Sequence, residues 1–133
     1  YGCGSGILGI AANLLGSEKV YAVDLDPQAL IATRANAEKN HVQDKIITFS
    51  VPQFKKQYSQ LQCPLLLANI LAGPLVELSE MLASHVQPGG KIVLSGILIE
   101  QAEKISTAYQ RWFHIDEIKQ EGDWIRVVGT KIP

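Results

Sequence analysis

The sequence is poor in cysteine, the residue that most often builds disulfide frameworks and metal centres. It has two, Cys3 and Cys63, among 133 residues. Their positions show neither metal-ligand spacing nor the pattern of a disulfide-rich domain. We therefore expect no metal site. We also expect Cys3 to be a small residue that fits its surroundings rather than a redox group.

An excess of charge of either sign is absent, and so is any long hydrophobic run. Twelve Lys and Arg residues stand against 13 Asp and Glu residues, a formal net charge of −1. Clustered basic residues dominate affinity for phosphate backbones, so this balance argues against direct nucleic-acid binding. It does not exclude an RNA-containing target reached through a protein partner. With no signal peptide and no run of 18 apolar residues, we expect a cytoplasmic protein with no membrane partner.

The chain also lacks an initial methionine: it begins with Tyr1, and its one methionine is Met81. It begins inside a glycine-rich loop, and such loops normally follow a buried central strand that aims them. We expect that first strand, with an acidic residue before the first glycine, to precede this chain in a longer protein. A sheet without its central strand exposes unpaired backbone groups. We therefore expect the 133 residues not to be stable alone.

What is present is an alternation of helical and β-rich segments, in a composition (47% hydrophobic, 19% charged) that fits one globular domain. The alternation predicts an α/β fold, a Rossmann-like, mostly parallel sheet closed by an antiparallel hairpin. The continuous apolar run 65–68 predicts a strand that is buried on both faces. Helices are predicted at 7–15, 28–40, 73–85 and 99–112, strands at 19–23, 46–51, 65–68, 91–95, 113–119 and 124–132, a turn at 87–90, and a loop or short helical turn at 52–62.

Glycines dominate the first residues of the chain, where Gly2, Gly4 and Gly6 alternate directly before an apolar helix. A backbone without Cβ atoms turns tightly and brings its amides close to a ligand. The helix that follows offers unpaired N–H groups and a positive dipole end to an anionic group. Asp24 ends the next predicted strand, where a ribose-binding acid is expected. Asp26 is better suited to cap the helix that begins at Pro27.

Two kinds of ligand are compatible with this loop. Residues 4–9 match the dinucleotide pattern G-x-G-x-x-G, and residues 2–6 resemble the G-x-G-x-G loop of class I S-adenosylmethionine methyltransferases. Both place a carboxylate after the second strand, because it can accept hydrogen bonds from both ribose hydroxyls. The apolar strand that ends in Asn69, the turn at 88–90 and the terminal hairpin resemble the methyltransferase pattern. The terminal hairpin is not expected in a nicotinamide-dependent enzyme.

Several stretches together resemble the bacterial ribosomal protein L11 methyltransferases. The Ala-Asn-Ile-Leu-Ala-Gly-Pro sequence at 68–74 is the specific part, since generic methyltransferases do not share it. That family joins an N-terminal substrate-recognition domain to a C-terminal catalytic domain, and residues 1–133 resemble only the second. The matching stretches are 2–12, 22–30, 68–75, 95–98, 101–103 and 121–124.

The resemblance implies a cofactor, a reaction and a partner. The cofactor is S-adenosyl-L-methionine, and the reaction is methylation of amino groups, on lysine side chains or the N-terminal amine, of ribosomal protein L11. In this picture Gly2, Gly4 and Gly6 bring backbone close to the methionine part of the cofactor, and Asp24 binds its ribose. We expect a monomer.

Asn69 is the expected catalytic residue, and it would also contact the cofactor. It resembles the first position of the Asn-Pro-Pro-Tyr motif of amino-group methyltransferases, although residues 70–72 are Ile-Leu-Ala. A carbonyl at this position would accept a hydrogen bond from the substrate amine and align its lone pair with the methyl group. The alternative is an asparagine that only caps a turn. No metal is needed, because positioning does most of the catalysis.

Other functions stay compatible with the sequence. Within the same class, the substrate could be RNA, DNA or a different protein. From other classes, an NAD-dependent oxidoreductase and a non-catalytic binding domain are the alternatives, since fold alone does not determine function.

Overall fold

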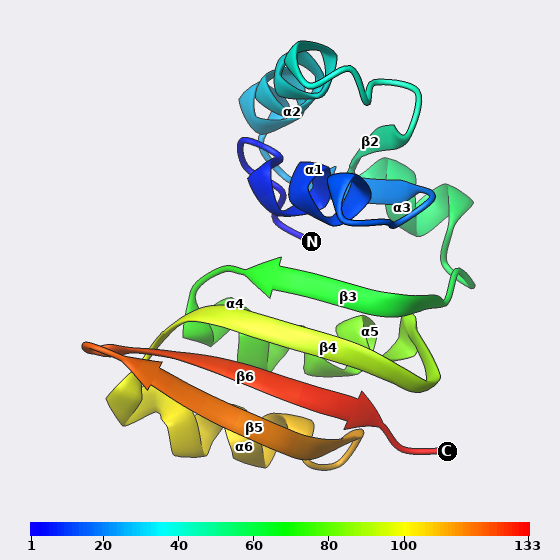
Figure 1. Ribbon diagram of the computed structural model, residues 1–133. Coiled ribbons are helices and arrows are strands. Elements are labelled where there is room, and N and C mark those ends of the chain that lie inside the picture. The colour runs from blue at the N-terminus through cyan, green and yellow to red at the C-terminus, as the bar shows by residue number, and fades with distance from the viewer. The chain divides into compact units, whose positions relative to one another are not determined.

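The strands lie in two sheets, one in each of two compact units, Tyr1–Ser59 and Gln60–Pro133 (Figure 1). The computed structural model describes all 133 residues. The predicted α/β alternation is confirmed, but only the first sheet is parallel throughout, and the second is mixed. The pairs β1–β2 and β3–β4 are parallel, and the pairs β4–β6 and β5–β6 are antiparallel.

The first unit places three helices around a two-stranded parallel sheet. Its small core joins the first two helices to the sheet through residues such as Ile10, Ala22 and Ala37. The segment expected as a loop or short helical turn is a helix, which Ser50 and Gln53 open with a reciprocal capping box. The elements are α1 (Ile7–Leu14), β1 (Val20–Asp24), α2 (Pro27–Lys39), β2 (Ile46–Ser50) and α3 (Val51–Gln57).

The second unit is a four-stranded sheet in the order β3-β4-β6-β5. Figure 1 shows α4, α5 and α6 on one face of this sheet. The predicted terminal hairpin is confirmed, and Glu121 and Trp124 form its last pair, beside Gly122 at φ 61°. The elements are β3 (Cys63–Asn69), α4 (Ala72–Glu77), α5 (Ser79–Ser84), β4 (Val86–Leu98), the 3-10 turn η1 (Ile99–Gln101), α6 (Ala102–Tyr109), β5 (Phe113–Glu121) and β6 (Trp124–Lys131).

The strand β3 departs from its prediction because its two faces are not equally covered within this unit. Leu66 and Ala68 are buried, but Pro64 and Leu65 are exposed. A short apolar run does not by itself tell how many faces of a strand are covered. The prediction that both faces of this strand are buried is therefore wrong within this unit.

Two further predictions differ in detail. The helix expected at 73–85 is broken at Leu78, which separates α4 from α5. The turn expected at 87–90 lies inside β4, where Gly89 has φ 78° and the pairing with β3 is irregular. Glycine and proline here mark a distortion within a strand rather than its start.

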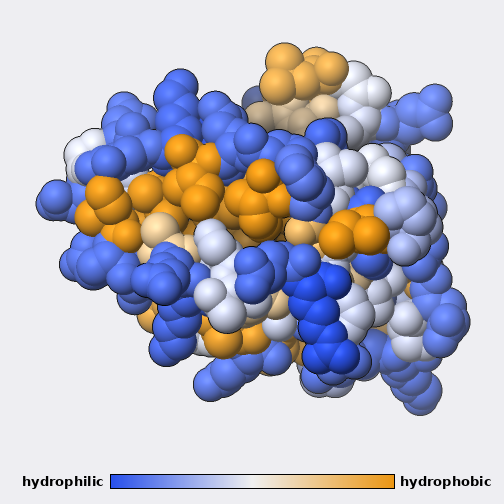
Figure 2. All heavy atoms as spheres, turned by 90° about the horizontal axis from the view of Figure 1, so that it is seen from below, coloured by the Kyte–Doolittle hydropathy of each residue, from blue (hydrophilic) through white to orange (hydrophobic).

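The surface carries apolar as well as charged side chains. Figure 2 shows an apolar stripe on one face, with hydrophilic side chains along both sides. Single exposed apolar residues are normal for folded proteins, whereas a contiguous apolar stripe can mark an interaction surface. None of the helices has the length and apolar character that crossing a membrane requires.

Candidate cofactor and substrate site

The three glycines of the loop all adopt the left-handed backbone conformation. Gly2, Gly4 and Gly6 have φ values of 70°, 55° and 85°. Residues with a Cβ rarely adopt these angles, so the alternation of glycines in the sequence is a requirement of the backbone. Gly6 is the N-cap of α1, and its carbonyl accepts a hydrogen bond from the Ile10 N–H at 2.9 Å.

Helix α2 holds the loop from one side through two polar side chains. The Thr33 hydroxyl donates to the Gly4 carbonyl at 3.0 Å, and the Asn36 side-chain amide donates to the Ser5 carbonyl at 2.8 Å. Thr33 is fully buried, and its methyl carbon would lie 2.8 Å from a Cβ at position 6. Sequence reasoning missed both residues. The available signal was a threonine at core-facing spacing in α2, beside Leu30.

Cys3 is part of this packing. Its N–H donates to the Val23 carbonyl at 3.0 Å, and its sulfur lies 3.3 Å from the Thr33 hydroxyl. Burial raises the pKa of the Cys3 thiol above its usual range, although the hydrogen bond with Thr33 acts in the opposite direction. A thiol that stays protonated is a poor nucleophile. The structure therefore agrees with the prediction that Cys3 is a small packing residue.

Asp24 ends β1 and contacts the glycine loop directly. One carboxylate oxygen accepts the Gly4 N–H at 2.9 Å, and the other accepts the Asp26 N–H at 3.0 Å. A carboxylate has about four acceptor positions, so each oxygen keeps a second one. Asp26 behaves as predicted: its side chain accepts the Gln28 N–H at 2.9 Å and caps α2.

The space in front of Gly4 is open. A Cβ at this position would meet no atom within 4 Å, whereas one at Gly6 would collide with Thr33. The two glycines therefore serve different purposes, because Gly6 allows packing against α2 and Gly4 leaves backbone accessible from outside. The Asp24 carboxylate keeps acceptor positions beside this open space, which suits a ligand that carries a pair of hydroxyls.

Asn69 belongs to the second unit, where it ends β3 opposite Ser95 of β4. It is exposed, and its side-chain oxygen lies against the backbone of Gly96. Helix α4 begins nearby with Leu71 as its N-cap and without a side-chain cap. Asn69 is therefore not the N-cap of this helix.

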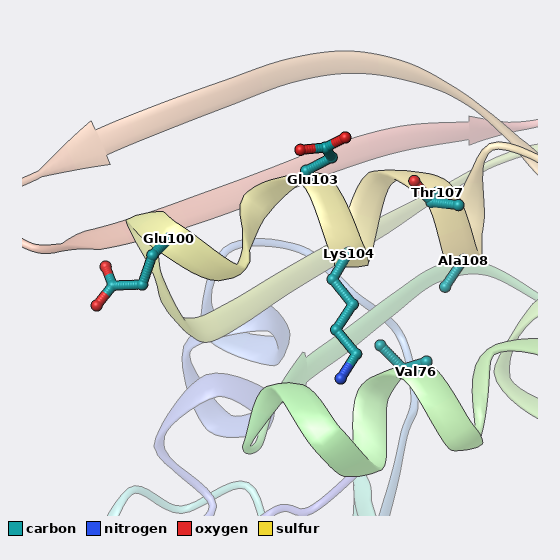
Figure 3. A pocket seen from close by; sticks show the side chains of 6 residues that line it. All are labelled: Val76, Glu100, Glu103, Lys104, Thr107 and Ala108. Atoms are coloured by element: carbon teal, nitrogen blue, oxygen red, sulfur yellow. The ribbon is translucent and has the colours of Figure 1, made fainter.

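The structure thus brings together the glycine loop and Asp24 within the first unit, and Asn69 with Gly96 within the second. A groove of about 520 Å³ between α4 and the segment η1–α6 contains none of these residues. Figure 3 shows that Lys104 extends from α6 toward α4 in this groove. The groove is lined by Val76, Glu100, Glu103, Lys104, Thr107 and Ala108.

Comparison with solved structures defines the class of fold. A ribosomal protein L11 methylase from Lactobacillus delbrueckii subsp. bulgaricus superposes with a TM-score of 0.89 at 33% identity, over 99% of this chain and 68% of that one. An RNA methyltransferase from Salinibacter ruber, in complex with S-adenosyl-L-homocysteine, gives a TM-score of 0.76 at 18% identity, over 98% and 77%. The chain therefore has the α/β fold of these methyltransferases.

Sequence comparison identifies the family. The family model for ribosomal protein L11 methyltransferase (PrmA) matches residues 1–132. The L11 methyltransferases of Marinomonas sp. and Marinobacter nauticus are 47% and 50% identical over 131 residues, which is 98% of this chain. The chain belongs to the ribosomal protein L11 methyltransferase family. It spans 43% of the length of each of these two relatives.

Proposed function

We propose that the protein carrying this chain transfers methyl groups from S-adenosyl-L-methionine to amino groups of ribosomal protein L11. Membership of the family supports this reaction. The structural observation that carries the proposal is the contact between the Gly4 amide and the Asp24 carboxylate, beside open space. It joins a ligand-accessible backbone to an acid that can hold a ribose.

The residues of the first unit fit this cofactor. Gly2, Gly4 and Gly6 would lie along its methionine part, and Asp24 would accept from its ribose hydroxyls with the remaining lone pairs. The bound cofactor supplies a methyl group activated by a sulfonium charge. The protein therefore needs to orient the reactants and exclude water rather than provide a nucleophile.

The substrate amine must be neutral when it attacks. At pH 7, deprotonating a lysine with a reference pKa near 10.4 costs roughly 4.6 kcal/mol, and desolvation in the site offsets part of this cost. We infer that Asn69 accepts a hydrogen bond from the amine N–H and so directs the lone pair toward the methyl group, and that it also borders the cofactor. No side chain is assigned as a general base.

The remaining predictions concern the whole protein. We propose a cytoplasmic monomer without direct nucleic-acid binding, in which a substrate-recognition domain and a further strand precede residues 1–133. In support of a preceding part, the chain spans 43% of the length of each of the two relatives. Family membership favours methyl transfer to a protein over the RNA, DNA and NAD alternatives.

The test uses the full-length protein. Titration with S-adenosyl-L-methionine and, separately, with NAD identifies the cofactor class, and we expect binding of the first. Incubation with ribosomal protein L11 should then add the mass of whole methyl groups to L11, and the variant Asn69→Ala should lose most of this activity. Unmodified L11, or binding of NAD alone, would show that the proposed function is wrong.

A further inference from the structure

We propose that Gly96 is a positioning residue for Asn69, because the lack of a side chain at position 96 keeps the Asn69 carbonyl oxygen in place. The inference rests on the proposed role of Asn69 toward the substrate amine. A Cβ at position 96 would lie 2.8 Å from the Asn69 Oδ1 and 2.8 Å from the Ile70 carbonyl oxygen. Real Cβ contacts are not this short, so any larger residue must displace Asn69 or the turn after it.

The backbone around Gly96 has a conformation that serves this purpose. Gly96 has φ 80°, and the register between β4 and β6 shifts between Leu94 and Ile97. Leu94 pairs with Val127 and Ile97 with Ile125, so two residues of β4 lie opposite one of β6. This is a β-bulge with a left-handed glycine, and such bulges redirect neighbouring side chains beside active sites.

The bulge is fixed on both sides. At its first residue, Ser95 pairs with Asn69 in the parallel ladder. After it, the Leu98 N–H donates to the Gln101 side-chain oxygen at 2.9 Å, and the Ile99 N–H donates to the Asp123 carbonyl at 2.9 Å. A backbone held at both ends cannot shift freely to make room for a Cβ. The displacement therefore falls on the Asn69 side chain and on the Ile70 carbonyl that follows it.

The chain offers a matched control for this inference. Gly89 lies in the same strand with φ 78°, nearly the angle of Gly96, but a Cβ there would meet no atom within 4 Å. The variants Gly96→Ala and Gly89→Ala therefore introduce the same backbone strain. They differ in the contact with Asn69.

The experiment measures kcat for methylation of ribosomal protein L11 by the full-length protein, together with Tm. We expect Gly96→Ala to lower kcat by about 100-fold relative to Gly89→Ala, the order of loss that a displacement of about 1 Å in a positioned group causes. In an Asn69→Ala background, Gly96→Ala should lower kcat no further. A merely structural glycine would lower kcat equally in both backgrounds.

The outcomes separate the two proposals. Full activity of Asn69→Ala would overturn the proposed role of Asn69. A strongly lowered but measurable kcat of Asn69→Ala, combined with equal kcat for the two glycine variants or with additive losses, would overturn the role of Gly96. If Gly96→Ala does not fold, Gln101→Leu releases the bulge at Leu98 instead, and Gln101→Glu keeps the acceptor. We expect kcat to fall several-fold in Gln101→Leu and to be unchanged in Gln101→Glu. An unchanged kcat in Gln101→Leu would contradict the inference.

Discussion

At the scale of single residues, Asp24 combines two tasks. Its carboxylate holds the Gly4 amide at 2.9 Å, which shapes the loop, and it keeps acceptor positions for a ligand. The Asp26 side chain, two residues further along, caps helix α2. Two acids of the same kind thus have different roles because one ends a strand beside the loop and the other begins a helix.

This difference leads to a prediction for cofactor affinity. Asp24→Asn should weaken binding of S-adenosyl-L-methionine by about 10- to 100-fold, since a charge-assisted hydrogen bond contributes roughly 1.5–3 kcal/mol. Asp26→Asn is the matched control and should bind normally, because asparagine caps helices about as well as aspartate. Isothermal titration calorimetry of the full-length variants measures both affinities. Equal affinities would show that Asp24 does not hold the ribose.

At the scale of secondary structure elements, one buried hydroxyl links two helices of the second unit. Tyr109 of α6 is fully buried and donates to the Leu75 carbonyl of α4 at 2.6 Å. Burial raises the pKa of the Tyr109 hydroxyl well above its usual range, so it remains a donor throughout the working pH range. The link lies one turn before the break at Leu78.

Removing this hydroxyl should destabilise the second unit. Tyr109→Phe leaves the Leu75 carbonyl without this donor, and a buried unsatisfied group costs about 1–3 kcal/mol. We expect the free energy of unfolding of the full-length protein in urea to fall by that amount. Tyr58→Phe, at a half-buried tyrosine of the first unit, should change it little. A Tyr109→Phe variant as stable as the parent protein would contradict this account.

A second link joins three strands and depends on pH. The Asp116 carboxylate, in β5, accepts a hydrogen bond from the Thr130 hydroxyl of β6 at 2.6 Å. It also contacts Lys91 of β4 and His114 of its own strand. These hydrogen bonds, with that from Thr130 the largest cause, lower the pKa of Asp116 from 3.8 to about 2. A carboxyl group with a lowered pKa in the folded state stabilises the protein above its unfolded pKa. That contribution disappears as the pH falls through the folded value.

The pH dependence can be measured against Asp116→Asn. The difference in unfolding free energy between the parent protein and this variant should be constant above about pH 4 and shrink between pH 4 and pH 2. The effect should be small and weaken with salt, because the group is exposed. A difference that does not vary over this range would show that the network does not affect stability.

At the scale of the whole molecule, the chain consists of two units with separate sheets. A two-stranded sheet is marginally stable in water unless other elements cover it. In the first unit, large apolar side chains of α1, such as Ile7, Leu8 and Leu14, remain exposed. We therefore predict that residues 1–133 are at most marginally stable by themselves.

Calorimetry tests this expectation directly. The isolated 133-residue chain should show no cooperative unfolding transition, whereas the full-length protein should unfold cooperatively. The physical reason is that strand edges and apolar helix faces left uncovered do not offset the conformational entropy of folding. A single sharp transition of the isolated chain, with equal calorimetric and van't Hoff enthalpies, would contradict it.

Short-range features were determined by the sequence alone. The cap at Asp26, the glycine loop and the hairpin beside Gly122 depend on the conformations that a few adjacent residues allow. Such preferences act over one turn of chain, so reading residues in order is enough to find them. The α/β alternation and the family resemblance followed from the same local patterns.

Only the tertiary structure decided which residues support the site from a distance. Thr33 meets Gly4 across 29 positions, and Gly96 meets Asn69 across a parallel ladder. The edge position of β3 and the break at Leu78 likewise depend on what each element packs against. These contacts form between segments that are far apart in the chain, and their geometry is set by packing rather than by local preference.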